Sequence, residues 1–169
     1  TDRFSPEAYD KNIQNFLAPY RHVVDSVNSN ITAWSVQDMT NNTRVGAYPN
    51  WTADFGLATA RLVADSIRAS GKDFPNVDLS IMNVGGIRQP IAKGAITEGQ
   101  ILSTFPFSNS MTIISIKGKD IIEALRVAAA KGGEAISGNM RVVTDGKGGL
   151  LKVIVNGESM DPEKEYVVS

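Results

Sequence analysis

The spacing of the apolar residues changes several times along the chain, and this alternation restricts the fold more than any other feature. Apolar positions three and four residues apart predict helices over residues 6–27, kinked at Pro19, and over 54–69 and 118–133. Apolar runs predict strands over residues 77–84, 111–118, 140–146, 150–157 and 166–169. Helices and strands interleave at first, and three strands then follow one another. The pattern therefore predicts an α+β fold in which helices pack on a mixed sheet, not a doubly wound sheet.

Local signals place the boundaries of several elements. Gly71 is expected to end the second helix, and Thr97 with Gln100 three residues later has the spacing of a capping box for a short helix. Residues 28–50 are polar, apart from a strand-like ITAWSVQ. At 169 residues the chain is long enough for one core, so residues 1–169 are expected to form one domain with residues 1–50 as a helical lead-in.

Composition excludes several classes of function. A net charge of −1 and a pI near 5.8 argue against binding to nucleic acid polymers or membrane surfaces. No apolar run has the length of a membrane span, and the first residues read as the trimmed start of a mature segment without a signal peptide. With no cysteine and one histidine, His22, the chain lacks the usual ligands of a transition-metal site. We therefore expect no catalytic residues, metal or cofactor in this chain.

The stretch NVGGIRQP, residues 83–90, follows a predicted strand and combines a glycine turn with an arginine. Gly85 and Gly86 allow a ligand to approach the backbone, and Arg88 offers a planar fork of donors suited to an anion or a sugar edge. Asn83 carries both a donor and an acceptor. A structural interpretation is equally simple: Asn83 caps the turn, and Arg88 pairs with a surface carboxylate. The residues alone favour the structural interpretation, because glycine turns after strands are common.

A second candidate is FPFSN, residues 105–109, in which Pro106 fixes the backbone between two aromatic residues. One of them can face the core while the other projects, and we assign Phe105 to the core. An exposed ring at Phe107 could stack on a nucleobase. From composition alone, a place in the core is the more common use of such a ring.

Three segments in order resemble the C-terminal domain of the 5'-nucleotidases, a family that includes UDP-sugar hydrolases and 2',3'-cyclic-nucleotide phosphodiesterases. They are NVGGIRQPI, GAITEGQILSTFPFSNSMTIISIKGKDIIEAL and AISGNMRVVTD. The resemblance covers residues 78–169 well and the helix over 54–69 loosely. It implies a two-domain enzyme whose N-terminal metallophosphatase domain carries two divalent metals and a His-Asp pair. The C-terminal domain, which this chain resembles, binds the nucleoside part of the substrate.

The resemblance also implies roles for individual residues. Asn83 and Arg88 would contact the nucleotide, Phe107 would stack on the base, and Asn109 would bond its edge. Gly138, in ISGN, would let the base lie against the backbone; otherwise it belongs to a turn before a strand. The implied partners are a nucleotide or nucleoside and a metallophosphatase domain, in the same chain or in another. The implied location is periplasmic, cell-surface or secreted.

Two departures from the family pattern leave a second hypothesis open. Before its second helix the family shows an arginine and a glutamate, whereas this chain reads NWTADFGLATARLVADS, with Arg61 in place of a family asparagine. Arg61 could supply the lost charge or pair with Asp65. The sequence also stops at EYVVS, before the family's second stacking aromatic and ribose-binding aspartate, so we expect the base to be held on one face. The alternative function is a non-enzymatic binding module with a decayed site.

Overall fold

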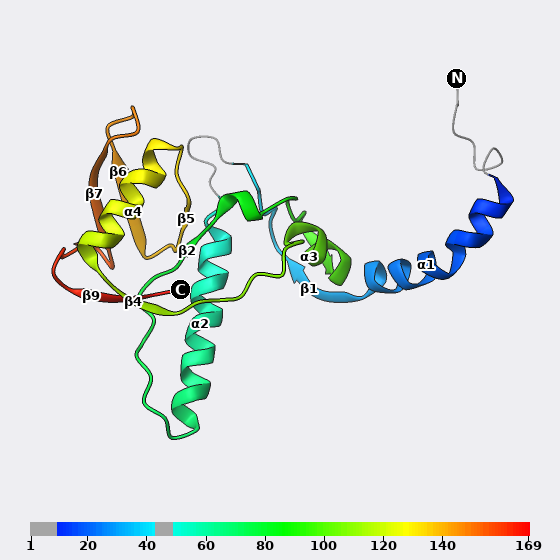
Figure 1. Ribbon diagram of the computed structural model, residues 1–169, viewed down its shortest axis with the longest axis horizontal. Coiled ribbons are helices and arrows are strands. Elements are labelled where there is room, and N and C mark those ends of the chain that lie inside the picture. Colours follow the sequence, from blue (N-terminus) through cyan, green and yellow to red (C-terminus); the bar gives the residue numbers. More distant parts are fainter. Residues whose placement is uncertain (1–9, 43–48) are drawn as a thin grey trace.

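The computed structural model describes residues 10–42 and 49–169. At its centre is a mixed sheet built around residues 77–82 (Figure 1). The end of this segment, β2 (Ile81–Met82), pairs antiparallel with β5 (Ala135–Ile136). On the other side Leu79 forms a parallel bridge to β9 (Glu165–Val168), which pairs antiparallel with β4 (Ile114–Lys117). Parallel and antiparallel neighbours in one layer confirm the predicted mixed sheet.

Two helices cover the two faces of this layer. The helix α2 (Trp51–Ala69) packs Leu57, Ala60 and Ala64 against Val77. The helix α4 (Gly118–Ala130) packs Ile121 and Leu125 against the next inward residue of the same segment, Leu79. Alternate side chains of β9 point to opposite faces, so Tyr166 and Val168 belong to the cluster under α4 while Val167 packs against the cluster under α2.

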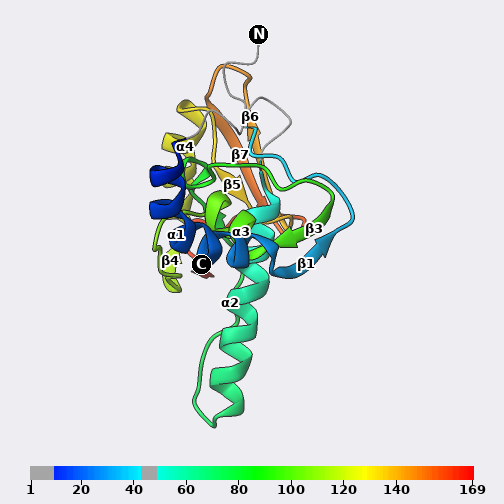
Figure 2. The ribbon, with the colours of Figure 1, turned by 90° about the vertical axis from the view of Figure 1, so that its right-hand side faces the viewer.

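The rest of the C-terminal half forms a small antiparallel meander of β6 (Met140–Thr144), β7 (Leu150–Val155) and β8 (Glu158–Ser159). It completes the cluster under α4 with Met140, Val153, Val155 and Met160. Figure 2 shows the meander and α4 on the same side of the molecule, with α2 extending below them. The final strand β9 leaves this meander and crosses to the central sheet, where it lies between residues 77–82 and β4.

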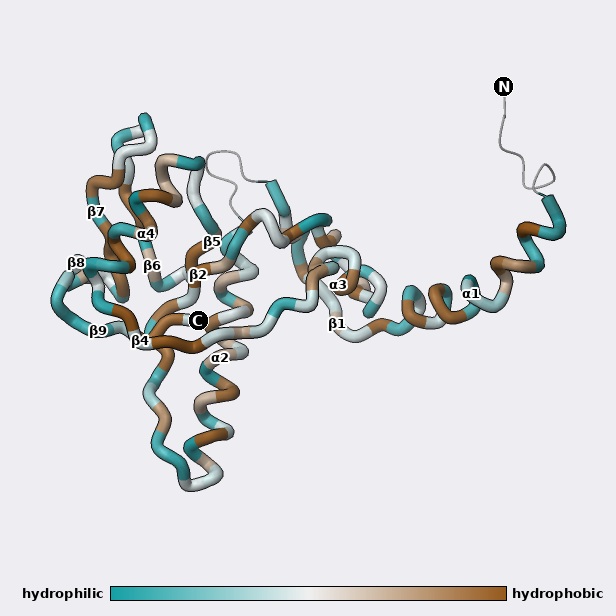
Figure 3. Tube along the Cα trace, viewed as in Figure 1, coloured by the Kyte–Doolittle hydropathy of each residue, from teal (hydrophilic) through white to brown (hydrophobic). Residues whose placement is uncertain are grey.

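Residues 11–35 form a separate projection from this body (Figure 1). The helix α1 (Lys11–Ser29) leads into β1 (Ile31–Ser35), which pairs antiparallel with β3 (Gly94–Thr97). The helix α3 (Glu98–Thr104) directly follows β3 and contacts α1. Figure 1 shows α1 extending away from the sheet, and Figure 3 shows apolar positions along it. None of the described residues of α1 is buried. Among the described residues, no helix has the length and hydropathy that crossing a membrane requires.

Several boundaries differ from the predicted ones. The helix α2 begins at Trp51, three residues early, because the backbone N–H and the hydroxyl of Thr52 both donate to the carbonyl of Pro49. The strand β4 is shorter than predicted, since residues 111–113 find no strand partner. The capping box of Thr97 and Gln100 is confirmed, as is the end of α2 at Gly71, whose φ is +81°. The start of the first predicted helix, residues 6–9, lies outside the described residues.

Candidate functional site

The turn after the central strand is closed by its own hydrogen bonds. Asn83 precedes a single 3-10 turn, η2 (Val84–Gly86), and every backbone N–H from Val84 to Arg88 donates to an acceptor within the chain. The acceptors, in order, are Glu134 Oε2 at 2.8 Å, Asn83 Oδ1 at 2.9 Å, Asn83 O at 3.1 Å, Val84 O at 3.1 Å and Thr104 O at 2.9 Å. The N–H groups of this glycine turn are therefore not free to bind an anion, so a ligand here must be recognised by side chains.

The side chains of Asn83 and Arg88 differ in the hydrogen bonds that they make. Asn83 caps the turn, as the structural interpretation proposed, because its Oδ1 accepts the Gly85 N–H. Its amide NH₂ group is thus the part that could meet a ligand. Arg88 is exposed and donates to the Gly85 carbonyl over a long 3.4 Å, and it forms no ion pair with a carboxylate of the described residues. The expected ion pair between Arg88 and a surface carboxylate is therefore not found among the described residues.

The second loop separates its two phenylalanines, but Phe105, which was expected in the core, belongs to neither buried apolar cluster. Phe105 is half-buried and packs its ring edge-on to Trp51, with ring centres 6.0 Å apart. Phe107 is 52% exposed, so the interpretation of Phe107 as a core aromatic is wrong. Asn109 is also exposed, and its backbone N–H donates to the Phe107 carbonyl at 2.8 Å. An exposed ring beside an exposed amide can offer a ligand both a stacking face and a hydrogen bond.

Gly138 lies in a turn held against the start of α2. Its N–H donates to Asp54 Oδ1 at 2.5 Å, and the Ile136 N–H donates to Asn50 Oδ1 at 3.2 Å. A Cβ added at Gly138 would lie 3.2 Å from Asp54 Oδ1, so the absence of a side chain permits this close approach. These partners could not be predicted from local sequence, because Asp54 and Asn50 are 84 and 86 residues away from the N–H groups that they bind.

Hydrogen bonds therefore join the candidate segments near the N-terminal end of α2. The Arg88 N–H to Thr104 carbonyl bond connects the glycine turn to the residue before Phe105, and the Glu134 bond connects that turn to the segment leading to Gly138. The described contacts include none between the side chains of Arg88 and Phe107. Their convergence on one ligand stays a prediction.

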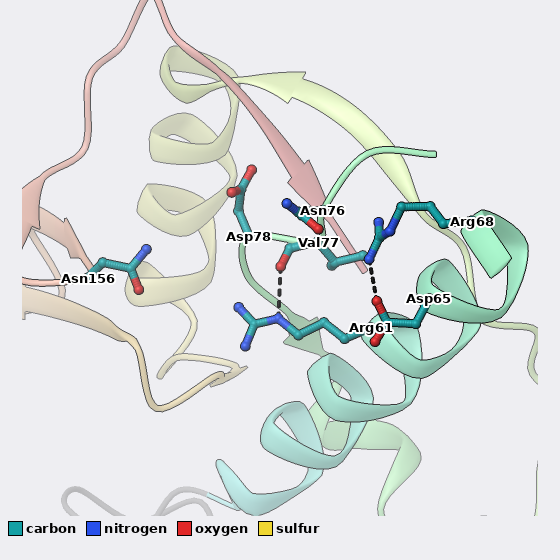
Figure 4. A pocket seen from close by; sticks show the side chains of 7 residues that line it. All are labelled: Arg61, Asp65, Arg68, Asn76, Val77, Asp78 and Asn156. Carbon is teal, nitrogen blue, oxygen red and sulfur yellow. Dashed lines mark hydrogen bonds and ion pairs between the residues drawn. The ribbon is translucent and has the colours of Figure 1, made fainter. Parts of the chain in front are cut away.

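Arg61 takes neither of its two expected roles (Figure 4). Its Nε donates to the Val77 carbonyl at 3.0 Å, and Asp65 forms its ion pair with Arg68 instead. Arg61 lines a hollow of about 320 Å³ at the start of the central strand. Six residues of extended chain, about 20 Å, separate Val77 from Asn83. Arg61 therefore lies too far along the strand to replace an arginine beside the glycine turn.

The described residues do not fit a metal centre. They contain no group of three or more histidine, cysteine, aspartate and glutamate side chains that could hold an ion. The candidate site instead offers one exposed ring, one guanidinium and amide groups. This donor set suits the binding of a polar aromatic ligand and provides no activated nucleophile.

Sequence comparison with protein families matches residues 36–169 to the C-terminal domain of 5'-nucleotidases. The chain belongs to this family. Among curated relatives, it is 33% identical over 116 residues to Endonuclease YhcR of Bacillus subtilis, covering 69% of this chain and 8% of that protein. It is 34% identical over 109 residues to Protein UshA of Yersinia enterocolitica, covering 62% of this chain and 19% of that protein.

Solved structures support the same fold for this 5'-nucleotidase C-terminal domain. The 5'-nucleotidase precursor of Thermus thermophilus superposes with a TM-score of 0.64 at 24% identity, over 96% of this chain and 34% of that one. The sulfate thiohydrolase SoxB of a Thermus species also gives 0.64, at 18% identity, over 94% of this chain and 30% of that one. The chain thus spans about a third or less of the length of these relatives and structures. The helix α1 lies outside the family match, which begins at Val36.

Proposed function

We propose that this chain is the nucleoside-recognition domain of a 5'-nucleotidase-type phosphohydrolase. A metallophosphatase domain, in the same polypeptide or in another, would hold the divalent metals and cleave the phosphate ester. The observation that carries the proposal is the exposure of Phe107 on a loop bonded, through Thr104, to the turn that presents Arg88. The family match supports it, because the chain corresponds to the C-terminal domain alone.

Each side chain has a defined role in this proposal. Phe107 stacks on the base, Asn109 bonds the base edge, and Arg88 with the Asn83 amide contacts the sugar or phosphate. Gly85, Gly86 and Gly138 leave room for the ligand to approach the backbone. This domain supplies binding energy and positions the substrate, whereas metal ions of the other domain would activate the attacking water. Family membership further leads us to place the whole protein in the periplasm, at the cell surface or outside the cell.

A decayed, non-enzymatic binding module is the second candidate. It is favoured by Arg61, which lies at the opposite end of the central strand from the glycine turn and binds the Val77 carbonyl. In a decayed module Phe107 and Arg88 would be exposed without a ligand, and nucleosides would not bind.

A titration of the chain with adenosine and AMP, followed by NMR, separates the two candidates. With one stacking ring we expect dissociation constants in the millimolar range, equivalent to about 4 kcal/mol. Phe107→Ala should abolish measurable binding, because a stacked base is worth about 1–3 kcal/mol. Arg88→Ala should weaken the binding of AMP. Both variants should keep the wild-type fold, since both side chains are exposed.

Matched controls are available elsewhere on the surface. Phe16 on α1 is 69% exposed, and Arg126 on α4 is exposed and paired only with Glu123 among the described carboxylates. Phe16→Ala and Arg126→Ala should leave both dissociation constants unchanged. Wild-type protein that shows no shifts at saturating AMP would support the decayed module. Binding that is indifferent to Phe107 would place the nucleoside elsewhere.

A further inference from the structure

Two carboxylates hold the turns that the proposed function assigns to the ligand. Glu134, in the loop between α4 and β5, accepts the Val84 N–H at 2.8 Å. Asp54, in the first turn of α2, accepts the Gly138 N–H at 2.5 Å. The bonded residues are 50 and 84 positions apart in the sequence, so each bond fixes one part of the fold against another.

Glu134 has a special place among the acceptors of the glycine turn. The N–H groups of Gly85, Gly86 and Ile87 all donate to atoms of Asn83 and Val84, so the turn satisfies them internally. Among the five donors from Val84 to Arg88, only that of Val84 is accepted by a side chain of another element. Val84 is the first residue of η2 and directly follows Asn83. The carboxylate therefore contacts the turn at its first residue, next to Asn83.

Asp54 does the same for the turn at Gly138. The carboxylate oxygen approaches the backbone so closely that a Cβ at this position would meet it at 3.2 Å. One helical turn earlier, Asn50 accepts the Ile136 N–H. Asp54 of α2 and Asn50, the residue directly before α2, thus bind residues 138 and 136 of a short segment whose strand β5 pairs with β2. A bond from an amide to an ionised carboxylate is stronger than one to a neutral acceptor, which suits a role in fixing a turn.

We propose that Glu134 and Asp54 are positioning residues of the nucleoside site. They do not touch the ligand; they hold the Asn83–Arg88 turn and the Gly138 turn in the geometry that binds it. The inference rests on the proposed function, because it assigns these carboxylates to the same site. It adds two residues that lie outside the motifs from which the site was predicted.

The test combines affinity with a local readout at the two amides. AMP is titrated into the 169-residue chain and its variants, and hydrogen exchange of the Val84 and Gly138 N–H groups is followed by NMR without ligand. Glu134→Ala should accelerate exchange at Val84, and Asp54→Ala at Gly138, while amides in α4 and β7 keep their protection. Each variant should bind AMP about tenfold more weakly, the effect of losing one ordinary hydrogen bond. Glu134→Gln and Asp54→Asn keep an acceptor oxygen and should recover most of the affinity.

Two other carboxylates provide matched controls. Glu123 on α4 pairs with Arg126, and Asp65 on α2 pairs with Arg68. Their alanine variants should bind AMP like the wild type. Wild-type protein that binds no AMP would reject the proposed function itself. Wild-type binding with unchanged affinity in Glu134→Ala and Asp54→Ala would reject only the positioning role. A loss as large in the Gln and Asn variants would also overturn it, because these variants keep an acceptor oxygen for the amide.

Discussion

At Gly86, an effect of substitution on ligand binding can be distinguished from an effect on the stability of the fold. A Cβ added there meets no atom within 4 Å, and its φ is not in the left-handed region. Gly86→Ala should therefore change the free energy of unfolding by less than about 0.5 kcal/mol. If a nucleoside approaches the turn, the added methyl group lies where the ligand comes closest, and AMP affinity should fall. Urea denaturation and an NMR titration measure the two effects.

Gly118 is the matched comparison for a glycine that the fold requires. A Cβ there would lie 2.1 Å from the Asp161 carbonyl oxygen and 3.1 Å from the ring of Tyr166. Gly118→Ala should destabilise the fold by about 1–3 kcal/mol, the usual cost of overpacking. Gly86→Ala with wild-type affinity for AMP would mean that the ligand stays away from the turn, whatever the role of Arg88.

At the scale of single residues, the sequence predicted the exposed members of the site but not their supports. Pro106 between two phenylalanines was enough to expect the projecting ring of Phe107, but Phe105, expected in the core, is only half-buried. The glycines of the turn were recognisable. Glu134 and Asp54 were not recognisable. Each accepts an amide from a distant segment, and no local pattern records which carboxylate will meet which N–H. Only the tertiary arrangement brings these groups together.

At the scale of elements, apolar spacing and caps were sufficient for the helices and the longer strands. The spacing of Leu57, Ala60 and Ala64 defined the buried face of α2, and the capping box defined the start of α3. The strands β3 and β5 were not predicted, because they have four and two residues and exist only through their pairing with β1 and β2. The path of β9 to the central sheet was equally absent from local pattern, since strand order depends on non-local contacts.

The loop between β6 and β7 gives a prediction for acidic pH. Backbone N–H groups of Lys147 and Gly149 donate to Asp145 at 2.7 and 2.8 Å, and they lower the pKa of Asp145 below its ordinary value of 3.8. A lowered pKa in the folded state means that the contribution of these bonds is present above pH 3.8 and is lost as the pH falls through the lower value. The Lys147 and Gly149 amide signals should therefore shift below pH 3.8. Asp145→Asn should remove that transition, whereas a midpoint at or above 3.8 would contradict the assignment.

At the scale of the whole molecule, several large exposed apolar side chains lie on α1, the helix outside the family match. The side chains of Ile13, Phe16, Tyr20 and Val23 on α1 are all more than half exposed. A helix of 19 residues without buried side chains gains little from tertiary packing, which supplies most of the stability of helices in proteins. The body formed by the central sheet, α2 and α4 does not depend on α1 for its two apolar clusters, because neither contains a residue of that helix.

We expect this chain alone to have no phosphohydrolase activity. The described residues hold no group of metal ligands, and the candidate site offers binding groups without a nucleophile or general base. The chain should therefore not hydrolyse AMP or a model phosphate ester when Mg²⁺, Mn²⁺ or Zn²⁺ is added. Phosphate release is measured alongside an Arg88→Ala, Phe107→Ala double variant, which controls for a contaminating phosphatase. Metal-dependent turnover that disappears in the double variant would contradict the proposed function. Phosphate cleavage and nucleoside recognition would then occur within one domain.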